Sequence, residues 1–206
     1  MTTTNPETLA AMAVPPPAYD LFRSDTYSLL GSLLSAPPNQ ALLDWLAELE
    51  NEAPEGNRMA RAWGALREAA SEAIAGPVLD EFNALFVGLG RGEIVPYGSW
   101  YLTGYLMEQP LVDLREDLRG LGLEVSDDTH EPEDHVAALC QVMALLVRPD
   151  GSFDPQQQHA FFARHMQSWC ERFFQDLQQC PSARFYRAVG LLGATFIGAE
   201  ALQLEA

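Results

Sequence analysis

The sequence contains no lysine, and all twelve of its basic residues are arginines. This absence excludes active sites that form a Schiff base on a lysine and nucleotide sites that use a P-loop lysine. Acidic residues number 29, which gives a formal net charge of −17. A chain this acidic repels nucleic acid and anionic membrane surfaces, so we expect neither as a partner. The charge favours a cationic partner, and it is equally compatible with a role in solubility alone.

Cysteine and histidine are also scarce, with three and four copies. Cys140, Cys170 and Cys180 are widely spaced and form no C-x-x-C pair, so we expect buried free thiols rather than disulfides. The histidines form two pairs whose spacings, five and six residues, do not place both members on one helical face. We therefore predict no metal site and no bound cofactor.

Long apolar runs are missing. The longest, Ala188–Ala199, lies between Arg187 and Glu200 and is shorter than the roughly 20 residues that cross a bilayer. No apolar segment typical of an export signal precedes Arg23, the first basic residue. We expect no membrane insertion and predict a cytoplasmic protein.

Apolar residues at helical spacing are abundant. They make up 48% of the chain, and no alternating strand pattern accompanies them. The sequence predicts an all-α fold, a single globular domain of about nine helices. Ser24 or Asp25 is expected to cap the first helix, Asp154 to begin one long helix that reaches Leu177, and Ser182 to cap the last.

The chain is expected to divide into a flexible tail, residues 1–18, and an all-helical domain, residues 19–206. The domain is predicted to have two loosely defined halves, 19–122 and 132–206. A segment rich in Asp and Thr, near 123–131, is expected to join them as a hinge.

Two segments concentrate polar and aromatic residues. In Glu131–His135, Pro132 fits the first turn of a helix, where the following carboxylates would meet the positive end of the helix dipole. In Pro96–Leu102 an aromatic cluster opens with a turn, and Tyr97, Tyr101 and Tyr105 recur at the spacing of one helical edge.

Three functions are compatible with these segments. Asp134 beside His135 would suit a small hydrolase, although neighbours on a helix point about 100° apart. An adaptor subunit would use the small residues of the last helix. A groove lined by aromatic side chains and rimmed by carboxylates would bind a peptide that presents apolar residues beside arginine, and this alternative fits the pattern best.

The sequence resembles the TorD/DmsD family of molybdoenzyme chaperones. The resemblance depends on four segments and extends roughly from Ser24 to Phe174. The segments are Glu81–Val87, Pro96–Tyr101, Glu131–His135, and Phe161–Met166 followed by Trp169.

The resemblance implies a cytoplasmic chaperone that is not an enzyme. Such a protein binds the twin-arginine signal peptide of the catalytic subunit of a molybdopterin-containing oxidoreductase, and holds the apoenzyme until its cofactor is inserted. It implies a monomer, or a homodimer formed by exchange of helical halves. The residues expected to bind the peptide are Phe82, Leu85, Phe86, Pro96, Tyr97, Ser99, Tyr101, Glu131, Asp134 and His135; no catalytic residue is predicted.

Overall fold

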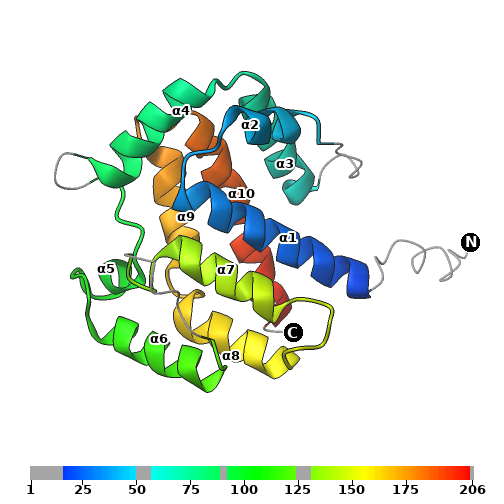
Figure 1. Cartoon of the computed structure of the whole chain (residues 1–206), viewed down its shortest axis with the longest axis vertical. Coiled ribbons are helices and arrows are strands. Elements are labelled where there is room, and N and C mark those ends of the chain that lie inside the picture. The colour runs from blue at the N-terminus through cyan, green and yellow to red at the C-terminus, as the bar shows by residue number, and fades with distance from the viewer. Residues whose placement is uncertain (1–15, 50–56, 89–91, 124–130, 205–206) are drawn as a thin grey trace, which may run out of the picture.

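The computed structural model describes residues 16–49, 57–88, 92–123 and 131–204, and the secondary structure in these ranges is helical. The ten α-helices are α1 (Pro16–Ser35), α2 (Gln40–Ala47), α3 (Arg58–Ser71), α4 (Ala75–Phe82), α5 (Gly98–Thr103), α6 (Gln109–Gly120), α7 (Val136–Leu146), α8 (Pro155–His165), α9 (Cys170–Gln179) and α10 (Phe185–Leu204), and a π-helix (Asn83–Val87) continues α4 (Figure 1). No β-strand occurs in the described ranges, where an isolated antiparallel bridge joins Tyr97 and His135. The all-α prediction is confirmed.

The first helix begins at Pro16, eight residues before the predicted cap Ser24. Proline fits this position because the first turn of a helix leaves its N–H groups unbonded. The predicted tail therefore ends earlier than residue 18, and its residues 1–15 lie outside the described ranges.

The long helix predicted after Asp154 is in fact two helices, which is why the described ranges hold ten helices instead of nine. The first of them starts where predicted, and Asp154 caps it through a reciprocal capping box with Gln157. Helix α8 ends at His165, and α9 begins at Cys170.

Helix α10 lies at the centre of the fold, in contact with α1, α3, α4 and α9 (Figure 1). Gly193 permits the close approach of α9, since a Cβ atom there would lie 2.1 Å from the ring of Phe174. In this fold the small residues of the last helix thus serve close packing within the chain.

Glu81 of α4 caps the start of α10. Its carboxylate accepts hydrogen bonds from the backbone N–H groups of Arg184, Phe185 and Tyr186, at 2.7, 3.2 and 2.8 Å. The predicted cap by Ser182 is wrong, because its hydroxyl donates to Glu93 instead, at 2.6 Å.

Among the described residues, α10 is the helix that could cross a membrane by length and composition. It has 20 residues, more than the predicted apolar run. However, 56% of its most apolar window is buried inside the protein. Its fully buried Glu200 also accepts two bonds from Arg23 of α1, at 2.8 and 2.9 Å. These are the contacts of a core helix.

Elements from both predicted halves share one core. Helices α1 and α7 lie side by side, and α10 packs on α3 (Figure 1). Most of the predicted hinge lies outside the described residues, so the hinge and the exchange of halves stay predictions. All three cysteines are free and buried, as predicted.

Candidate functional site

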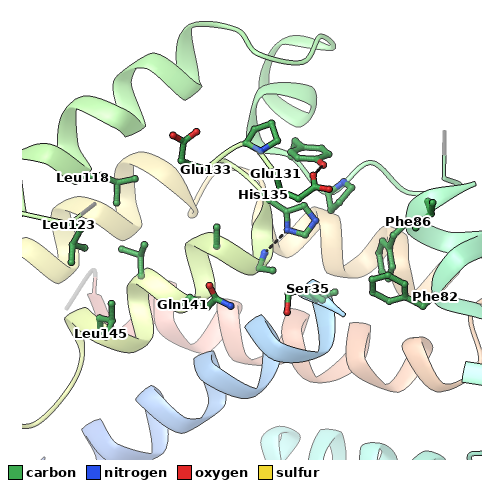
Figure 2. A pocket seen from close by; sticks show the side chains of 18 residues that line it. Ser35, Phe82, Phe86, Leu118, Leu123, Glu131, Glu133, His135, Gln141 and Leu145 are labelled. Carbon is green, nitrogen blue, oxygen red and sulfur yellow. Dashed lines mark hydrogen bonds between the residues drawn. The ribbon is translucent and has the colours of Figure 1, made fainter. Parts of the chain in front are cut away.

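A pocket of about 640 Å³ lies beside α7, where α1, α6 and the π-helix meet it. Figure 2 shows Phe82 and Phe86 at one end and Leu118, Leu123 and Leu145 at the other. Glu131 and His135 lie between the two apolar ends. The full lining is Leu34, Ser35, Phe82, Phe86, Val87, Pro96, Tyr97, Leu118, Leu123, Glu131, Pro132, Glu133, His135, Ala137, Ala138, Gln141, Val142 and Leu145.

The π-helix positions the aromatic end of the pocket. The ring of Phe86 lies 5.1 Å from that of Phe82 and 5.4 Å from that of Tyr186 in α10. Gly92 packs directly on the π-helix backbone, since a Cβ atom there would lie 2.4 Å from the carbonyl oxygen of Leu85. Only glycine allows this contact, which supports the turn that carries Phe86.

The two predicted recognition segments lie against each other. The N–H of Val136 donates to the carbonyl of Pro96 at 2.8 Å, and the N–H of Gly98 donates to that of Asp134 at 2.9 Å. The Asp134 carboxylate is buried and accepts from both the N–H and the hydroxyl of Ser99. Backbone and side-chain bonds therefore fix these segments together.

Helix α7 begins at Val136, with His135 as its N-cap. The Nδ1 atom of His135 accepts a hydrogen bond from the N–H of Ala137 at 3.1 Å, which leaves the proton of the neutral ring on Nε2. The prediction that Pro132 occupies the first helical turn is wrong. Residues 133 and 134 form a turn before the helix, closed by the bond from the N–H of His135 to the carbonyl of Pro132 at 3.1 Å, so neither carboxylate belongs to the first turn of α7.

Tyr97 and His135 form the polar centre of the pocket. Their rings meet edge to face, with centroids 5.1 Å apart, and the Tyr97 hydroxyl donates to the carboxylate of Glu131. Burial lowers the pKa of His135 to about 4 against the opposing effect of nearby Glu131 and Asp134. Burial and the bond to Glu131 raise the pKa of Tyr97. At neutral pH both rings are uncharged.

The structure brings six of the ten predicted site residues to the pocket: Phe82, Phe86, Pro96, Tyr97, Glu131 and His135. The other four do not line it. Leu85 is in the core, and Ser99 and Asp134 are buried and bonded to each other. Tyr101 faces α9, where its hydroxyl donates to Asp176 at 2.9 Å and its ring stacks on Trp169.

The predicted tyrosine edge is wrong at its third member. Helix α5 ends at Thr103, with Gly104 in a left-handed conformation. Tyr105 consequently lies beyond the helix and is 70% exposed.

Sequence reasoning missed the α7 side of the pocket. Four residues of α7, Ala138, Gln141, Val142 and Leu145, follow the i, i+3, i+4, i+7 spacing of one helical face. The buried face of α7 carries Leu139, Cys140, Met143 and Leu146. A second apolar stripe on a helix that already has a core-facing one was the signal available in the sequence.

The pair required by the hydrolase alternative does not form. The Asp134 carboxylate is bonded to Ser99, whereas the His135 ring is bonded to the backbone of Ala137. Within the described ranges, no three His, Cys, Asp or Glu side chains are placed to share a metal ion. What the pocket offers is apolar surface and two carboxylates, Glu131 and Glu133.

Comparison with known proteins identifies the family. A family model described as the nitrate reductase delta subunit matches residues 50–175, more than half of the chain. The chain belongs to this family. Curated relatives named chaperone protein TorD accompany the match, which confirms the resemblance to the TorD/DmsD family.

The alignments with the TorD relatives cover different shares of the two chains. TorD of Vibrio cholerae is 29% identical over 126 residues, and the match covers 57% of this chain and 57% of that protein. The chain thus spans little more than half the length of this relative. TorD of Ferrimonas balearica is 29% identical over 179 residues, which cover 84% of this chain and 79% of that protein.

The fold has a counterpart among solved structures. A crystal structure of a candidate redox enzyme maturation protein from Archaeoglobus fulgidus superimposes with a TM-score of 0.50 at 16% identity. It covers 89% of this chain and 94% of that one. At this identity the likeness shows the fold of the family.

Proposed function

We propose that this protein is a maturation chaperone that binds the signal segment of a molybdenum enzyme in the pocket beside α7. The observation that carries the proposal is the contact of Tyr97 with Glu131 and His135 at the centre of a pocket that has an apolar end on either side. The same residues belong to the segments that resemble the TorD/DmsD family. The bound segment would be a twin-arginine signal peptide of the catalytic subunit.

The volume of the pocket supports a segment as the ligand. About 640 Å³ falls within the roughly 300–1,000 Å³ of ordinary ligand pockets. Such a space holds a few side chains and excludes a folded domain. Apolar residues of the segment would bury the exposed side chains Val87 and Leu145, which are 58% and 36% accessible.

The charges support a basic residue beside the apolar ones. Glu131 is exposed at the centre of the pocket, where it would bind a guanidinium group. Exposed ion pairs contribute only about 0–1 kcal/mol, so apolar contact supplies most of the affinity and Glu131 fixes the orientation. The net charge of −17 adds long-range attraction for a cationic segment.

The proposal includes the finer roles that the family resemblance implies. The chaperone would act in the cytoplasm and hold the apoenzyme until its molybdopterin cofactor is inserted, without catalysing a reaction itself. It would work as a monomer or as a homodimer. These points depend on the client, which co-purification from the native host followed by mass spectrometry would identify.

Calorimetric titration with a synthetic peptide, two consecutive arginines followed by an apolar segment, tests the pocket. Val87→Ser and Leu145→Ser alter exposed lining residues, so the fold should tolerate both changes. We expect each to weaken binding by about 5- to 10-fold, the loss of roughly 1–1.4 kcal/mol of apolar contact.

Leu202→Ala is the matched control, because Leu202 is 69% exposed on α10 and does not line the pocket. It should bind the peptide as the wild type does. If the peptide binds and neither Val87→Ser nor Leu145→Ser weakens it, the binding site is elsewhere. If the peptide does not bind at all, the proposed function is wrong.

A further inference from the structure

The two carboxylates of the pocket are in different states. Glu131 accepts its bond from the uncharged hydroxyl of Tyr97, and a neutral donor leaves the negative charge in place. Glu133 is bound by the guanidinium of Arg115, with Nε–Oε1 at 2.8 Å and Nη2–Oε2 at 2.7 Å. The first contact is a hydrogen bond and the second an ion contact, because Oε2 is buried without a hydrogen-bond partner. Together they match the charge of Glu133 with a positive one.

The ion pair with Arg115 neutralises one of the two carboxylates that line the pocket. The hydrogen bond from Arg115 lowers the pKa of Glu133, and the same bond raises the pKa of Arg115. Both groups therefore stay ionised over the physiological range, and their charges cancel. Because the His135 ring is neutral, the charged residues at the pocket reduce to one uncompensated carboxylate, that of Glu131.

The position of Arg115 follows from helix α6. Leu118, one turn further along α6, lines the pocket, while Arg115 reaches Glu133 from the same helix. Figure 2 places Glu133 towards the Leu118 end of the pocket and Glu131 near its centre. Arg115 therefore already forms an ion pair with Glu133, the carboxylate that a second basic residue of a peptide would need.

We infer that Arg115 determines the specificity of the pocket: because Glu133 is already paired, only one of the two arginines of a bound segment forms an ion pair, at Glu131. The inference depends on the proposed function of this pocket as a peptide site. A second arginine of the peptide gains nothing unless it displaces Arg115 from Glu133. Arg115 is 49% exposed, so its replacement should not unfold the protein.

The experiment measures the affinity of four peptides for each protein variant by calorimetry. The peptides carry Arg-Arg, Arg-Gln, Gln-Arg or Gln-Gln before the same apolar segment. For the wild type, we expect the Arg-Arg peptide to bind no more than about twofold more tightly than the better single-arginine peptide. For Arg115→Gln, which frees Glu133, this ratio should rise to about fivefold, within the range of one exposed ion pair.

Two further variants show whether the effect acts through Glu133. The double variant Arg115→Gln/Glu133→Gln restores the charge balance and should return the ratio to the wild-type value. Arg119→Gln removes an exposed arginine from the same helix and should leave the ratio unchanged, because it alters the net charge without freeing Glu133.

The outcomes separate this inference from the proposed function. If the wild type binds arginine peptides more tightly than the Gln-Gln peptide, but Arg115→Gln keeps the wild-type ratio, the function stands and the role of Arg115 is refuted. If Arg115→Gln and Arg119→Gln raise the ratio equally, only net charge matters and the role is again refuted. If no variant binds any peptide, both proposals are wrong.

Discussion

The carboxylate of Asp134 holds Ser99 by two hydrogen bonds, one from the backbone N–H at 2.7 Å and one from the hydroxyl. Both residues are buried, at 3% and 0% exposure. The bonds join the segment before α7 to the first turn of α5, and so connect the two segments that line the centre of the pocket. Asp134 thus acts on the site through Ser99.

Asp134→Ala should destabilise the protein by about 1–3 kcal/mol, because it leaves two buried donors of Ser99 without an acceptor. Asp134→Asn retains a carbonyl oxygen and should cost less. Urea unfolding followed by circular dichroism measures both. An Asp134→Ala protein with wild-type stability that fails to bind the peptide would show a direct contact with the ligand and contradict this role.

His135→Asn should remove part of the pH dependence of stability. The folded protein holds the pKa of His135 near 4, below the ordinary value of 6.5. Between these values the unfolded chain binds a proton that the folded chain does not, so wild-type stability falls as pH drops from 6.5 to 4. From pH 7 to pH 5 this loss amounts to about 2 kcal/mol.

Asparagine cannot titrate, and it is a good N-cap for α7. The free energy of unfolding of His135→Asn should therefore fall by about 2 kcal/mol less than that of the wild type over the same pH interval. Urea titrations at pH 7 and pH 5 provide the comparison. Equal losses in both proteins would mean that His135 titrates normally when folded.

Glu81→Ala should destabilise the core, because three N–H groups at the start of α10 lose their acceptor. We expect a cost of about 1–2 kcal/mol, the upper range for loss of a helix cap. Asp80→Ala is the control, since Asp80 is the exposed neighbour on α4. Thermal unfolding should show a lower midpoint for Glu81→Ala alone; matching midpoints would contradict the cap.

Glu200→Ala should be the most damaging of these changes, with a loss of about 3 kcal/mol, because the buried guanidinium of Arg23 loses its two-point partner. It keeps only the Nη1 contacts to Asp20 and Gln158, at 3.1 and 3.3 Å. The hydroxyl of Tyr27 also donates to Glu200, at 3.1 Å. The double variant Arg23→Met/Glu200→Leu removes both charges and should recover much of the loss. Urea unfolding measures the stability of both variants. If they are equally destabilised, loss of the carboxylate partner of Arg23 is not the cause.

The sequence predicted correctly those features that depend on neighbouring residues. Asp154 begins a helix as expected, and its own side chain caps that helix. Expectations failed where a distant residue takes over a local role. Ser182 does not cap α10 because Glu81, a hundred residues earlier in the chain, already bonds the N–H groups of its first turn.

The site residues also divide into those that the sequence indicated and those that only contacts between distant segments determine. Aromatic and acidic composition indicated the segments of Tyr97 and Glu131, and the family resemblance indicated Phe86; all three residues line one pocket. Composition could not indicate that Asp134 faces inward while Glu131, three residues earlier, is exposed. That difference arises from the bonds of Asp134 to Ser99, which exist only once both segments are folded together.

The sequence by itself determined the helical class, the net negative charge and the family, since these follow from periodicity, composition and short motifs. Only the tertiary structure decided which residues share a pocket and which carboxylates have a cationic partner. The ion pair between Arg115 and Glu133 is the example. The physical reason is that pairing and burial depend on contacts between distant segments, whereas helix propensity and net charge belong to the chain before it folds.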